Sequence, residues 1–450
     1  MKLHLPLSLR AALLSCFAAA ALVTPAAADL TWDPAKSTWA VNQPFASDGS
    51  TFQQEDDVIF GTLTTKDETV NLQGTLKVGD MVVDAGSGNT YLFSGSGSIT
   101  SLGSLTVTSG TAEFDAVERL SSPASGAVSQ VATGAKLKLD YNKDEEEYNL
   151  NITLAGSDAP GTPAATLELA SAGDDLDEYH LYGSLRMGNG SVLQVGGNGV
   201  ALYRIDASLT VAEGDTVTLK NTGYVCYLYL PDPSKVEGTI CLDGNPFWLK
   251  PEGAGTYKLK VMSDTGVALQ APNVHADIEL SRGREALLAF RNSNTSASLH
   301  MGSGSEIYAY AYEVDFATVE QLTGSGTFVL GSGSLTLEKA DGEADDFTGT
   351  IRLEGGKYAI GNIGIFCEDD ATLTLGASDV AAQATVELEK YGTYVYSLAL
   401  AKGVESATLK KLTGTEYSRL QAGTYRVTNG GSFAGTLDDG VTLTVGAGSP

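Results

Sequence analysis

The sequence predicts an all-β protein built as a parallel β-helix, a β-solenoid in which short strands stack coil upon coil. Three observations lead to this fold class. A unit of the form small–Ser/Thr–aliphatic–x–aliphatic recurs along the chain, its residues alternate between apolar and variable positions, and no convincing amphipathic helix interrupts it. One small supersecondary unit used many times, with loops of variable length, is typical of a solenoid. Tandem β-sandwich domains are the alternative architecture, because they also consist of short half-buried strands.

The repeated unit predicts which side chains form the core. Its eleven strict copies begin at Gly74, Gly103, Ala165, Gly183, Ala207, Gly238, Ala297, Gly333, Gly349, Ala371 and Ala384. Positions three and five are always aliphatic or Met, whereas position four varies and is Thr, Lys, Arg, Glu, His or Cys. Because a strand alternates its side chains between two faces, one face is buried and the other is wet. We expect Leu335, Leu337, Leu373 and Leu375 in a shared core, with Thr336 and Thr374 directed to solvent.

The first 28 residues have the features of a secretory signal peptide. Lys2 and Arg10 give a basic start, residues 11–23 form an apolar run, and three alanines end at Ala28. We predict cleavage between Ala28 and Asp29. No later segment has the ~18 uninterrupted apolar residues of a membrane helix. The sequence therefore predicts an exported protein with no transmembrane helix after signal removal.

The mature chain divides into a short opening module and a long repetitive body. Residues 29–60 contain Trp32 and Trp39, and this aromatic content suits an N-terminal cap that covers the open end of a solenoid. Residues 61–450 form the expected solenoid, with loop excursions near 121–165 and 223–248. The second excursion is rich in Tyr and reads as a projecting hairpin. The related segments AGTYKL and AGTYRV indicate a sub-boundary near 250–290.

The charge balance excludes several partners. The formal net charge is −27, and loss of Lys2 and Arg10 with the signal peptide makes it −29. Such an acidic surface repels nucleic acid and anionic membranes. The sequence contains nothing that predicts an obligate oligomer. We expect a surface or glycan partner, whose identity the sequence does not specify.

No catalytic, cofactor-binding or metal-binding residue is predicted. His180, His275 and His300 are isolated in the sequence, and no nucleophile elbow, phosphate loop or dinucleotide fingerprint occurs. Acidic runs such as Asp56–Asp57 and Glu368–Asp370 offer oxygen ligands, but Asp is also common in turns. No cofactor is therefore predicted, with calcium as the alternative.

The cysteine content limits disulfide formation. Cys16 leaves with the signal peptide, so Cys226, Cys241 and Cys367 remain. An odd count in an exported protein allows at most one internal bond. A disulfide between Cys226 and Cys241 would close a short loop, and two reduced thiols are the alternative.

Residues 322–362 resemble a known repeat. They contain a Gly-Ser-Gly-Thr lead, a Leu-Thr-Leu strand and, at 347–356, the sequence FTGTIRLEGG. This arrangement is similar to the autotransporter-associated β-strand repeat. The resemblance implies a secreted or surface-displayed parallel β-helix from a Gram-negative-type bacterium, at the extracellular or outer surface or in the periplasm. It implies no catalytic residues, because the repeat has none.

Two functions compete at this level. The first is a secreted or cell-surface, non-enzymatic β-helical scaffold with an adhesive role, whose ligands bind surface segments such as 121–165 or 223–248. The alternative is a carbohydrate-active β-helix enzyme, either a polysaccharide lyase or a glycoside hydrolase, which needs placed carboxylates. Convergence of Asp, Arg and Tyr in a cleft on one solenoid face would favour the enzyme.

Overall fold

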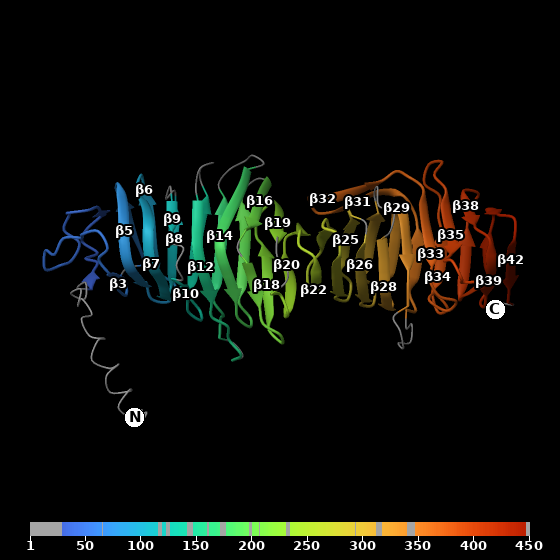
Figure 1. Ribbon diagram of the computed structural model, residues 1–450, viewed down its shortest axis with the longest axis horizontal. Helices are drawn as coiled ribbons and strands as arrows, with labels where there is room; N and C mark the ends of the chain where they lie inside the picture. The colour runs from blue at the N-terminus through green and yellow to red at the C-terminus, as the bar shows by residue number, and fades with distance from the viewer. Residues whose placement is uncertain are drawn as a thin grey trace, which may run out of the picture.

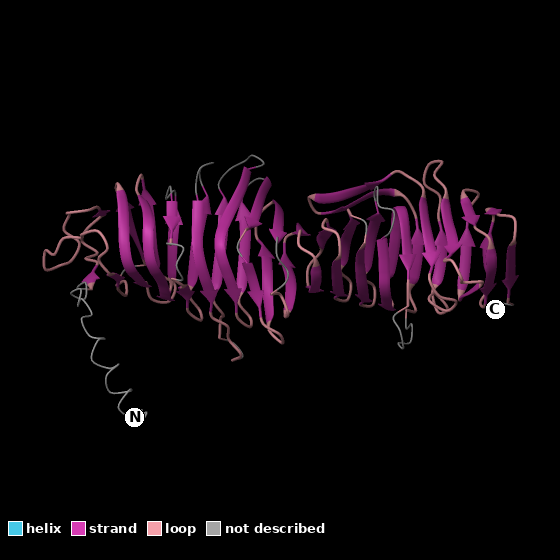
Figure 2. Cartoon of the chain, viewed as in Figure 1, coloured by secondary structure: helices cyan, strands magenta, loops and turns pink. Residues whose placement is uncertain are grey.

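The computed structural model is an elongated rod of strands and loops, and the chain runs from one end of the rod to the other (Figure 1). In the part that the structure describes, every regular element is a β-strand and there is no helix (Figure 2). None of these residues forms a helix of the length and hydropathy that a membrane crossing requires. The structure describes residues 29–446 except 65, 116–118, 123–126, 142–146, 160–161, 172–176, 198–199, 207, 231–234, 293, 312–316 and 340–346.

The strands form a parallel β-solenoid of about 14 turns. Most strands pair in parallel with the strand one coil before and the strand one coil after. This confirms the fold class predicted from the repeats. It does not favour the β-sandwich alternative, whose sheets are built from antiparallel strands.

Two long ladders run along most of the rod. The first ladder contains β2 (Thr38–Trp39), β4 (Asp67–Leu72), β6 (Thr90–Gly95), β8 (Thr111–Asp115), β11 (Lys136–Tyr141), β13 (Thr166–Ser171), β15 (Val192–Gly197), β18 (Thr216–Asn221), β20 (Thr239–Gly244), β22 (Gly255–Val261), β24 (Val274–Leu280), β26 (Thr295–Met301), β28 (Ala317–Gly324), the second half of β29 (Thr327–Leu337), β33 (Ala371–Leu375), β35 (Tyr396–Leu400), β38 (Ser418–Leu420) and β41 (Thr436–Leu437). The second ladder contains the first half of β14 (Asp177–Met187), β16 (Val200–Ile205), β19 (Val225–Leu230), β21 (Phe247–Pro251), β23 (Thr265–Leu269), β25 (Glu285–Phe290), β27 (Glu306–Ala311), the first half of β29, β30 (Thr350–Leu353), β34 (Thr385–Leu388), β37 (Lys411–Gly414) and β40 (Gly431–Phe433).

A third side of the coil is formed at both ends of the rod. Towards the N-terminus, long strands bend across two sides of the coil. These long strands are β5 (Thr75–Asp84), β7 (Ser98–Ser109), β12 (Glu147–Leu154) and β14. The shorter strands beside them are β1 (Leu30–Thr31), β3 (Val58–Phe60), β9 (Arg119–Ser121), β10 (Ser129–Val131) and β17 (Ser208–Val211). Towards the C-terminus the third side contains β36 (Ser406–Leu409), β39 (Gly423–Val427) and β42 (Val441–Val445).

Gly183 shows why a small residue opens the repeated unit. It lies where β14 stops pairing with β16 and starts pairing with β17. Its φ is +103°, and a Cβ atom there would lie 2.3 Å from the carbonyl oxygen of Leu150 in the neighbouring coil. Only glycine tolerates both the backbone conformation and the close approach. At this corner the first position of the unit therefore requires glycine.

The interior of the rod is one continuous apolar core. Leu335, Leu337, Leu373 and Leu375 are each 0–1% exposed, as predicted, and Leu335 pairs with Leu373 in the next coil. Thr336 and Thr374 alternate with them and are partly exposed. The period-two pattern therefore identifies the buried face of the first ladder.

Aromatic side chains fill the N-terminal end of this core. In the segment expected to be a cap, Trp39 contacts Phe45, Phe52 and Phe60 at ring-centroid distances of 5.4–5.7 Å. Phe60 contacts Phe93 of β6 at 4.8 Å. Residues 29–60 therefore pack large apolar side chains against the first coils, and their role as a cap stays a prediction.

The expected loop excursions are not separate from the stack. Within 121–165, β10 pairs with β7 and β12, and β11 pairs with β8 and β13. Within 223–248, β19 pairs in parallel with β16 and β21, so it is a rung and not a projecting hairpin. The ladder β20–β22–β24–β26 also continues through 250–290 without a boundary. Turn-rich and Tyr-rich composition misled these predictions, because solenoid corners tolerate both.

An antiparallel hairpin that the sequence did not reveal lies on the outside of the second ladder. It contains β31 (Gly356–Ile360) and β32 (Ile363–Cys367), and it crosses the rungs along the rod (Figure 1). Ile360, Ile363 and Ile365 are at most 4% exposed because they pack onto outward residues of the rungs. This second apolar cluster lies outside the main core and contains Trp248, Ala268, Leu287, Ala289, Tyr310, Ile360, Ile363, Ile365 and Cys367.

Candidate functional site

The register of four neighbouring rungs gathers polar and aromatic side chains on the outside of the second ladder. The rungs are β14, β16, β19 and β21. Tyr179 and Tyr203 point into the core and pair with each other in register, and Leu228 and Leu249 continue that row. Because side chains alternate along a strand, the residues on either side of this row point outward. The outward rows bring Glu178 beside Leu202, Tyr227 and Trp248, and His180 beside Arg204, Tyr229 and Lys250.

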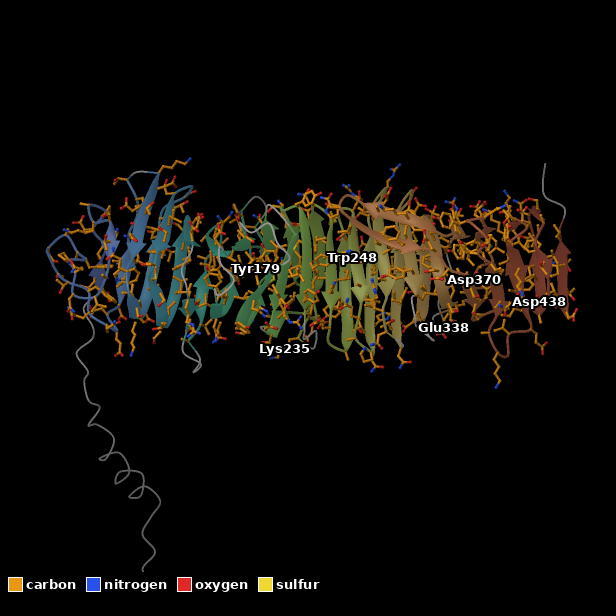
Figure 3. The ribbon with its side chains drawn as sticks, turned by 90° about the horizontal axis from the view of Figure 1, so that it is seen from above. Tyr179, Lys235, Trp248, Glu338, Asp370 and Asp438 are labelled. Carbon is orange, nitrogen blue, oxygen red and sulfur yellow. The ribbon has the colours of Figure 1, made fainter. Side chains whose placement is uncertain are left out.

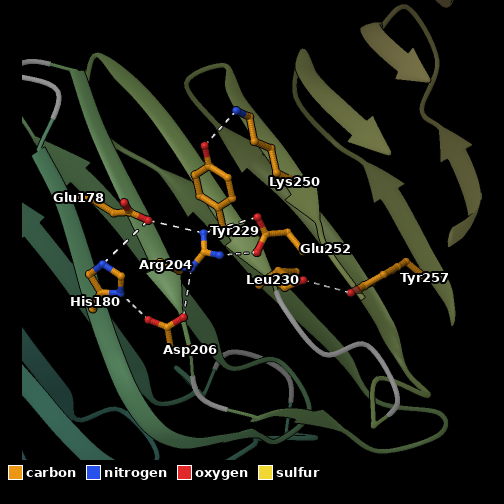
Figure 4. A network of polar contacts seen from close by, with 9 residues as sticks. All are labelled: Glu178, His180, Arg204, Asp206, Tyr229, Leu230, Lys250, Glu252 and Tyr257. Atoms are coloured by element: carbon orange, nitrogen blue, oxygen red, sulfur yellow. Dashed lines mark hydrogen bonds and ion pairs between the residues drawn. The ribbon is translucent and has the colours of Figure 1, made fainter. Parts of the chain in front are cut away.

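Arg204 lies at the centre of a network of carboxylates (Figure 4). Its guanidinium donates to Glu252 Oε2 at 2.7 Å from Nη2, and to Asp206 Oδ1 at 3.1 Å from Nε. Glu178 lies at 3.5 Å from Nη1. The Cζ atom of Arg204 also lies 5.2 Å from the centroid of the Tyr229 ring. The guanidinium is therefore held in one orientation by three acidic groups and one aromatic face.

Lys250 has a different environment. Its ammonium donates to the Tyr229 hydroxyl at 3.1 Å and lies 4.5 Å from the Tyr227 ring centroid and 4.8 Å from that of Tyr229. Among the described residues, no carboxylate lies within ion-pair distance of it, which distinguishes it from Arg204. Two tyrosine faces therefore hold this cation at the surface.

His180 belongs to the same group, although the sequence gave no sign of a partner. Its Nδ1 atom contacts Asp206, its Nε2 atom lies 3.8 Å from Glu178, and its ring stacks on Tyr182 at 5.4 Å. Tyr182 is 37% exposed. We call the group formed by Tyr182, Tyr227, Tyr229, Arg204 and Lys250 the tyrosine platform. It presents aromatic faces and fixed hydrogen-bonding groups together.

The tyrosines beneath the platform have a structural role. Burial raises the pKa of the Tyr203 phenol far above its ordinary value, and the same group donates a hydrogen bond to the carbonyl of Gly196. The platform therefore stands on a rigid and uncharged layer. The hairpin limits the platform on one side, since Asn362 at the hairpin turn donates to the Tyr224 carbonyl at 3.3 Å and Trp248 lies in the covered cluster.

The predicted disulfide is not formed. Cys226 points into the core from β19, whereas Cys241 occupies an outward position on β20, and both are free. The expected outward position of Cys241 is confirmed, but Cys226 points inward from the other ladder, so the two thiols do not face each other. The predicted signal-peptide cleavage site lies between Ala28 and Asp29. Ala28 is outside the described residues, and Asp29 is the first residue that the structure describes.

Two members of the acidic runs considered for calcium bond backbone amides of the neighbouring coil. Asp57 accepts a hydrogen bond from the Asp80 amide at 2.7 Å, and Asp370 accepts one from the Val395 amide at 2.7 Å. Across the described residues, no three His, Cys, Asp or Glu side chains are arranged to hold a metal ion. The other histidines lie elsewhere on the rod: His275 contacts Ser296 at 2.8 Å and His300 contacts Asp277 at 3.0 Å.

Comparisons with known proteins do not extend this picture. No protein-family model matches the chain, and searches of curated proteins and of solved structures find no match. Sequence reasoning noted the concentration of Tyr in 223–248 but missed the platform. The signal that was present is Tyr at alternate positions 227 and 229, on either side of the inward Leu228. Arg204 gave no signal, because its position depends on the pairing of coils of unequal length.

Proposed function

We propose that this protein is an exported, non-enzymatic β-helical scaffold that adheres to glycans, and that the tyrosine platform is its binding surface. The observation that carries the proposal is the placement of Tyr227 and Tyr229 beside Lys250 and Arg204 on one outward face. The predicted signal peptide supports export. The resemblance to the autotransporter-associated repeat supports a scaffold at a bacterial surface.

The chemistry of the platform suits a sugar. A pyranose ring has a face of C–H bonds and a rim of hydroxyl groups. The C–H face is attracted to the electron-rich face of a tyrosine ring, as other weakly positive edges are. The hydroxyl rim needs donors and acceptors in fixed positions, which guanidinium, ammonium and carboxylate groups supply. Tyr227 and Tyr229 provide the first element, and Lys250, Arg204 and Glu252 provide the second.

Other ligand classes fit less well. With a net charge of −27 in the full sequence, the surface repels nucleic acid and other polyanions. Arg204 is surrounded by three carboxylates, so little positive charge is left to attract an anion. A neutral glycan avoids both costs.

A carbohydrate-active enzyme is the second candidate, and one observation favours it. Asp206, Arg204 and Tyr229 converge on one solenoid face, which is part of what the enzyme requires. A glycosidase also needs an acid and a second carboxylate that are free to act on the glycosidic bond. Here the carboxylates of Glu178, Asp206 and Glu252 are paired with Arg204, which favours binding over catalysis.

Binding is tested with the mature protein, residues 29–450, on an array of neutral and acidic glycans, followed by calorimetric titration of the best ligand. We expect Tyr227→Ala and Tyr229→Ala each to weaken binding by about tenfold, equivalent to ~1.4 kcal/mol. Thr374→Ala, at an outward position on β33 of the first ladder, is the control and should bind normally. Absence of glycan binding, or unchanged affinity in both tyrosine variants, would refute the proposal.

Catalysis is tested on the same ligand. New reducing ends or unsaturated sugar ends, formed by the wild type and lost in Asp206→Asn, would establish the enzyme in place of the scaffold. We expect neither product.

A further inference from the structure

A second candidate binding site lies in the last coils of the rod. A shallow depression of about 290 Å³ lies where β35, β38 and β41 are neighbours in the first ladder. It lies near the C-terminal end, where Figure 3 labels Asp438, whereas Trp248, beside the tyrosine platform, is labelled near the middle of the rod. The depression is lined by Val395, Glu416, Tyr417, Ser418, Arg419, Thr436 and Asp438.

The ladder and two ion pairs hold the charged side chains of this depression in place. Arg419 points outward from β38 and pairs in register with Ser397 and Thr436. Its guanidinium makes a two-pronged contact with Asp438, at 2.8 Å from Nε and 3.0 Å from Nη2. Lys390 bonds Glu416 at 2.6 Å and lies 4.7 Å from the centroid of the Tyr417 ring.

These contacts repeat the constellation of the tyrosine platform. In both places a lysine ammonium lies over a tyrosine ring, at 4.5–4.8 Å on the platform and 4.7 Å here. In both places an arginine is fixed by a carboxylate through two nitrogen–oxygen contacts, to Glu252 in one case and to Asp438 in the other. The two sites come from different ladders and from unrelated stretches of sequence.

We propose that the depression beside Tyr417 is a second glycan-binding site, and that one polysaccharide chain engages it together with the tyrosine platform. Its ligand class rests on the glycan-binding function proposed above. The size of the depression is at the lower limit of small-molecule pockets, which suits a single sugar unit of a longer chain.

The charges of the depression select a neutral ligand. Arg419 is neutralised by Asp438, and Lys390 is neutralised by Glu416. A phosphate or sulfate would have to break one of these pairs or bind beside a carboxylate. A sugar hydroxyl can use the donors of Arg419 and the acceptors of Asp438 that remain free, with the pair intact.

The distance between the sites sets the length of chain that can bridge them. Along the second ladder, β23, β25, β27, β29, β30 and β34 lie between β21 and β37, the strand that directly precedes β38. At ~4.8 Å per rung the two sites are roughly 35 Å apart along the rod axis, and because they lie on different ladders the path that a chain must follow is longer than this. A polysaccharide longer than this gains effective concentration at the second site once the first is occupied. A short oligosaccharide does not.

The experiment compares a long polysaccharide and a short oligosaccharide of the same sugar, by surface plasmon resonance with the mature protein in solution. We expect the wild type to bind the long chain at least about a hundredfold more tightly than the short one, the lower end of avidity gains. Tyr417→Ala and Arg419→Ala should each remove that gain and leave platform binding of the short chain unchanged. Arg426→Ala, an exposed arginine on β39, is the matched control and should retain the gain.

The outcomes separate the two proposals. If the tyrosine-platform variants weaken binding and both Tyr417→Ala and Arg419→Ala keep the full avidity, the second site is wrong and the platform stands. If the Tyr417 and Arg419 variants lose the avidity while Tyr227→Ala and Tyr229→Ala bind normally, the platform is wrong. If the wild type binds no glycan of either length, both proposals fail. Circular dichroism of each variant shows that its fold is intact.

Discussion

Truncation of Leu335 tests the assignment of inward and outward positions in the repeated unit. Leu335 and Thr336 are adjacent in β29, yet the leucine is 1% exposed and the threonine is partly exposed at the surface. We expect Leu335→Ala to destabilise the protein strongly and Thr336→Ala to change stability little. Because the two residues are neighbours, a general effect on the strand cannot produce the contrast.

The magnitude follows from the packing around Leu335. Its rung neighbours are Ala317 before it and Leu373 after it, both at most 1% exposed. Burial of a leucine side chain contributes about 1.5–3 kcal/mol, and an unfilled cavity adds to the loss. The hydrogen-bonded ladders on both sides prevent collapse of the neighbouring coils into the space. We therefore expect a loss of ~2–5 kcal/mol for Leu335→Ala and within about 0.5 kcal/mol for Thr336→Ala.

The assay is urea unfolding followed by far-ultraviolet circular dichroism on the mature protein. Leu335→Asp is a third variant, expected to be the least stable, because it places an unpaired charge in the core. Equal shifts of the midpoint for Leu335→Ala and Thr336→Ala would show that both faces of β29 are buried. In that case the one-core solenoid is the wrong description of this segment.

Gly266→Val should displace the Trp248 indole, because a ring carbon would lie 2.6 Å from the new Cβ atom. The variant should have a lower thermal unfolding midpoint and an altered tryptophan fluorescence. Gly61→Ala is the control and should change neither, because a Cβ atom there meets nothing within 4 Å. Cys241 should react first with a thiol reagent in the folded protein, because Cys226 and Cys367 are buried and burial raises the pKa of Cys367 to about 11; simultaneous reaction of all three would contradict the model of the core. Burial is the main cause that raises the pKa of Glu354 above its ordinary value of 4.5, so the ionised form is disfavoured in the folded protein. Glu354→Gln should therefore stabilise the protein at pH 7. The gain in stability should shrink as the pH falls towards 4.5, because the glutamate then becomes protonated. A gain that is constant across this range in urea unfolding would exclude that explanation.

Most of the fold could be predicted because one physical rule, alternation about a single buried face, repeats in every coil. Leu335, Leu337, Leu373 and Leu375 lie where the rule puts them. The errors came where composition was used in place of periodicity. β10, β11 and β19 carry turn-rich or Tyr-rich neighbours, but they pair in register as ordinary rungs.

The strands that the hairpin covers differ from the other rungs in sequence, but the alternation pattern alone does not explain the difference. Residues 266–269 and 286–290 are continuous apolar runs, with no polar residue at the outward positions. In a parallel sheet such runs indicate strands that are buried on both faces. The structure supplies the cover, since β31 and β32 lie over β23 and β25. What the runs could not show is which segment covers them, because Ile360 and Ile365 are about 70–100 residues further along the chain.

Packing under the hairpin explains some of the outward residues of the second ladder but not all of them. Trp248, Leu287 and Tyr310 are apolar at outward positions because the hairpin buries them. In the two rungs before Trp248, the same rows contain Tyr227, Tyr229 and Arg204, which stay partly exposed. Tyr227 packs against the edge of the covered cluster, and Tyr229 contacts Arg204 and Lys250. Packing against the cluster therefore explains part of the position of Tyr227 but not that of Tyr229. The placement of both rings beside Lys250 is the feature that the proposed glycan ligand would use, and for that reason the glycan experiments should begin there.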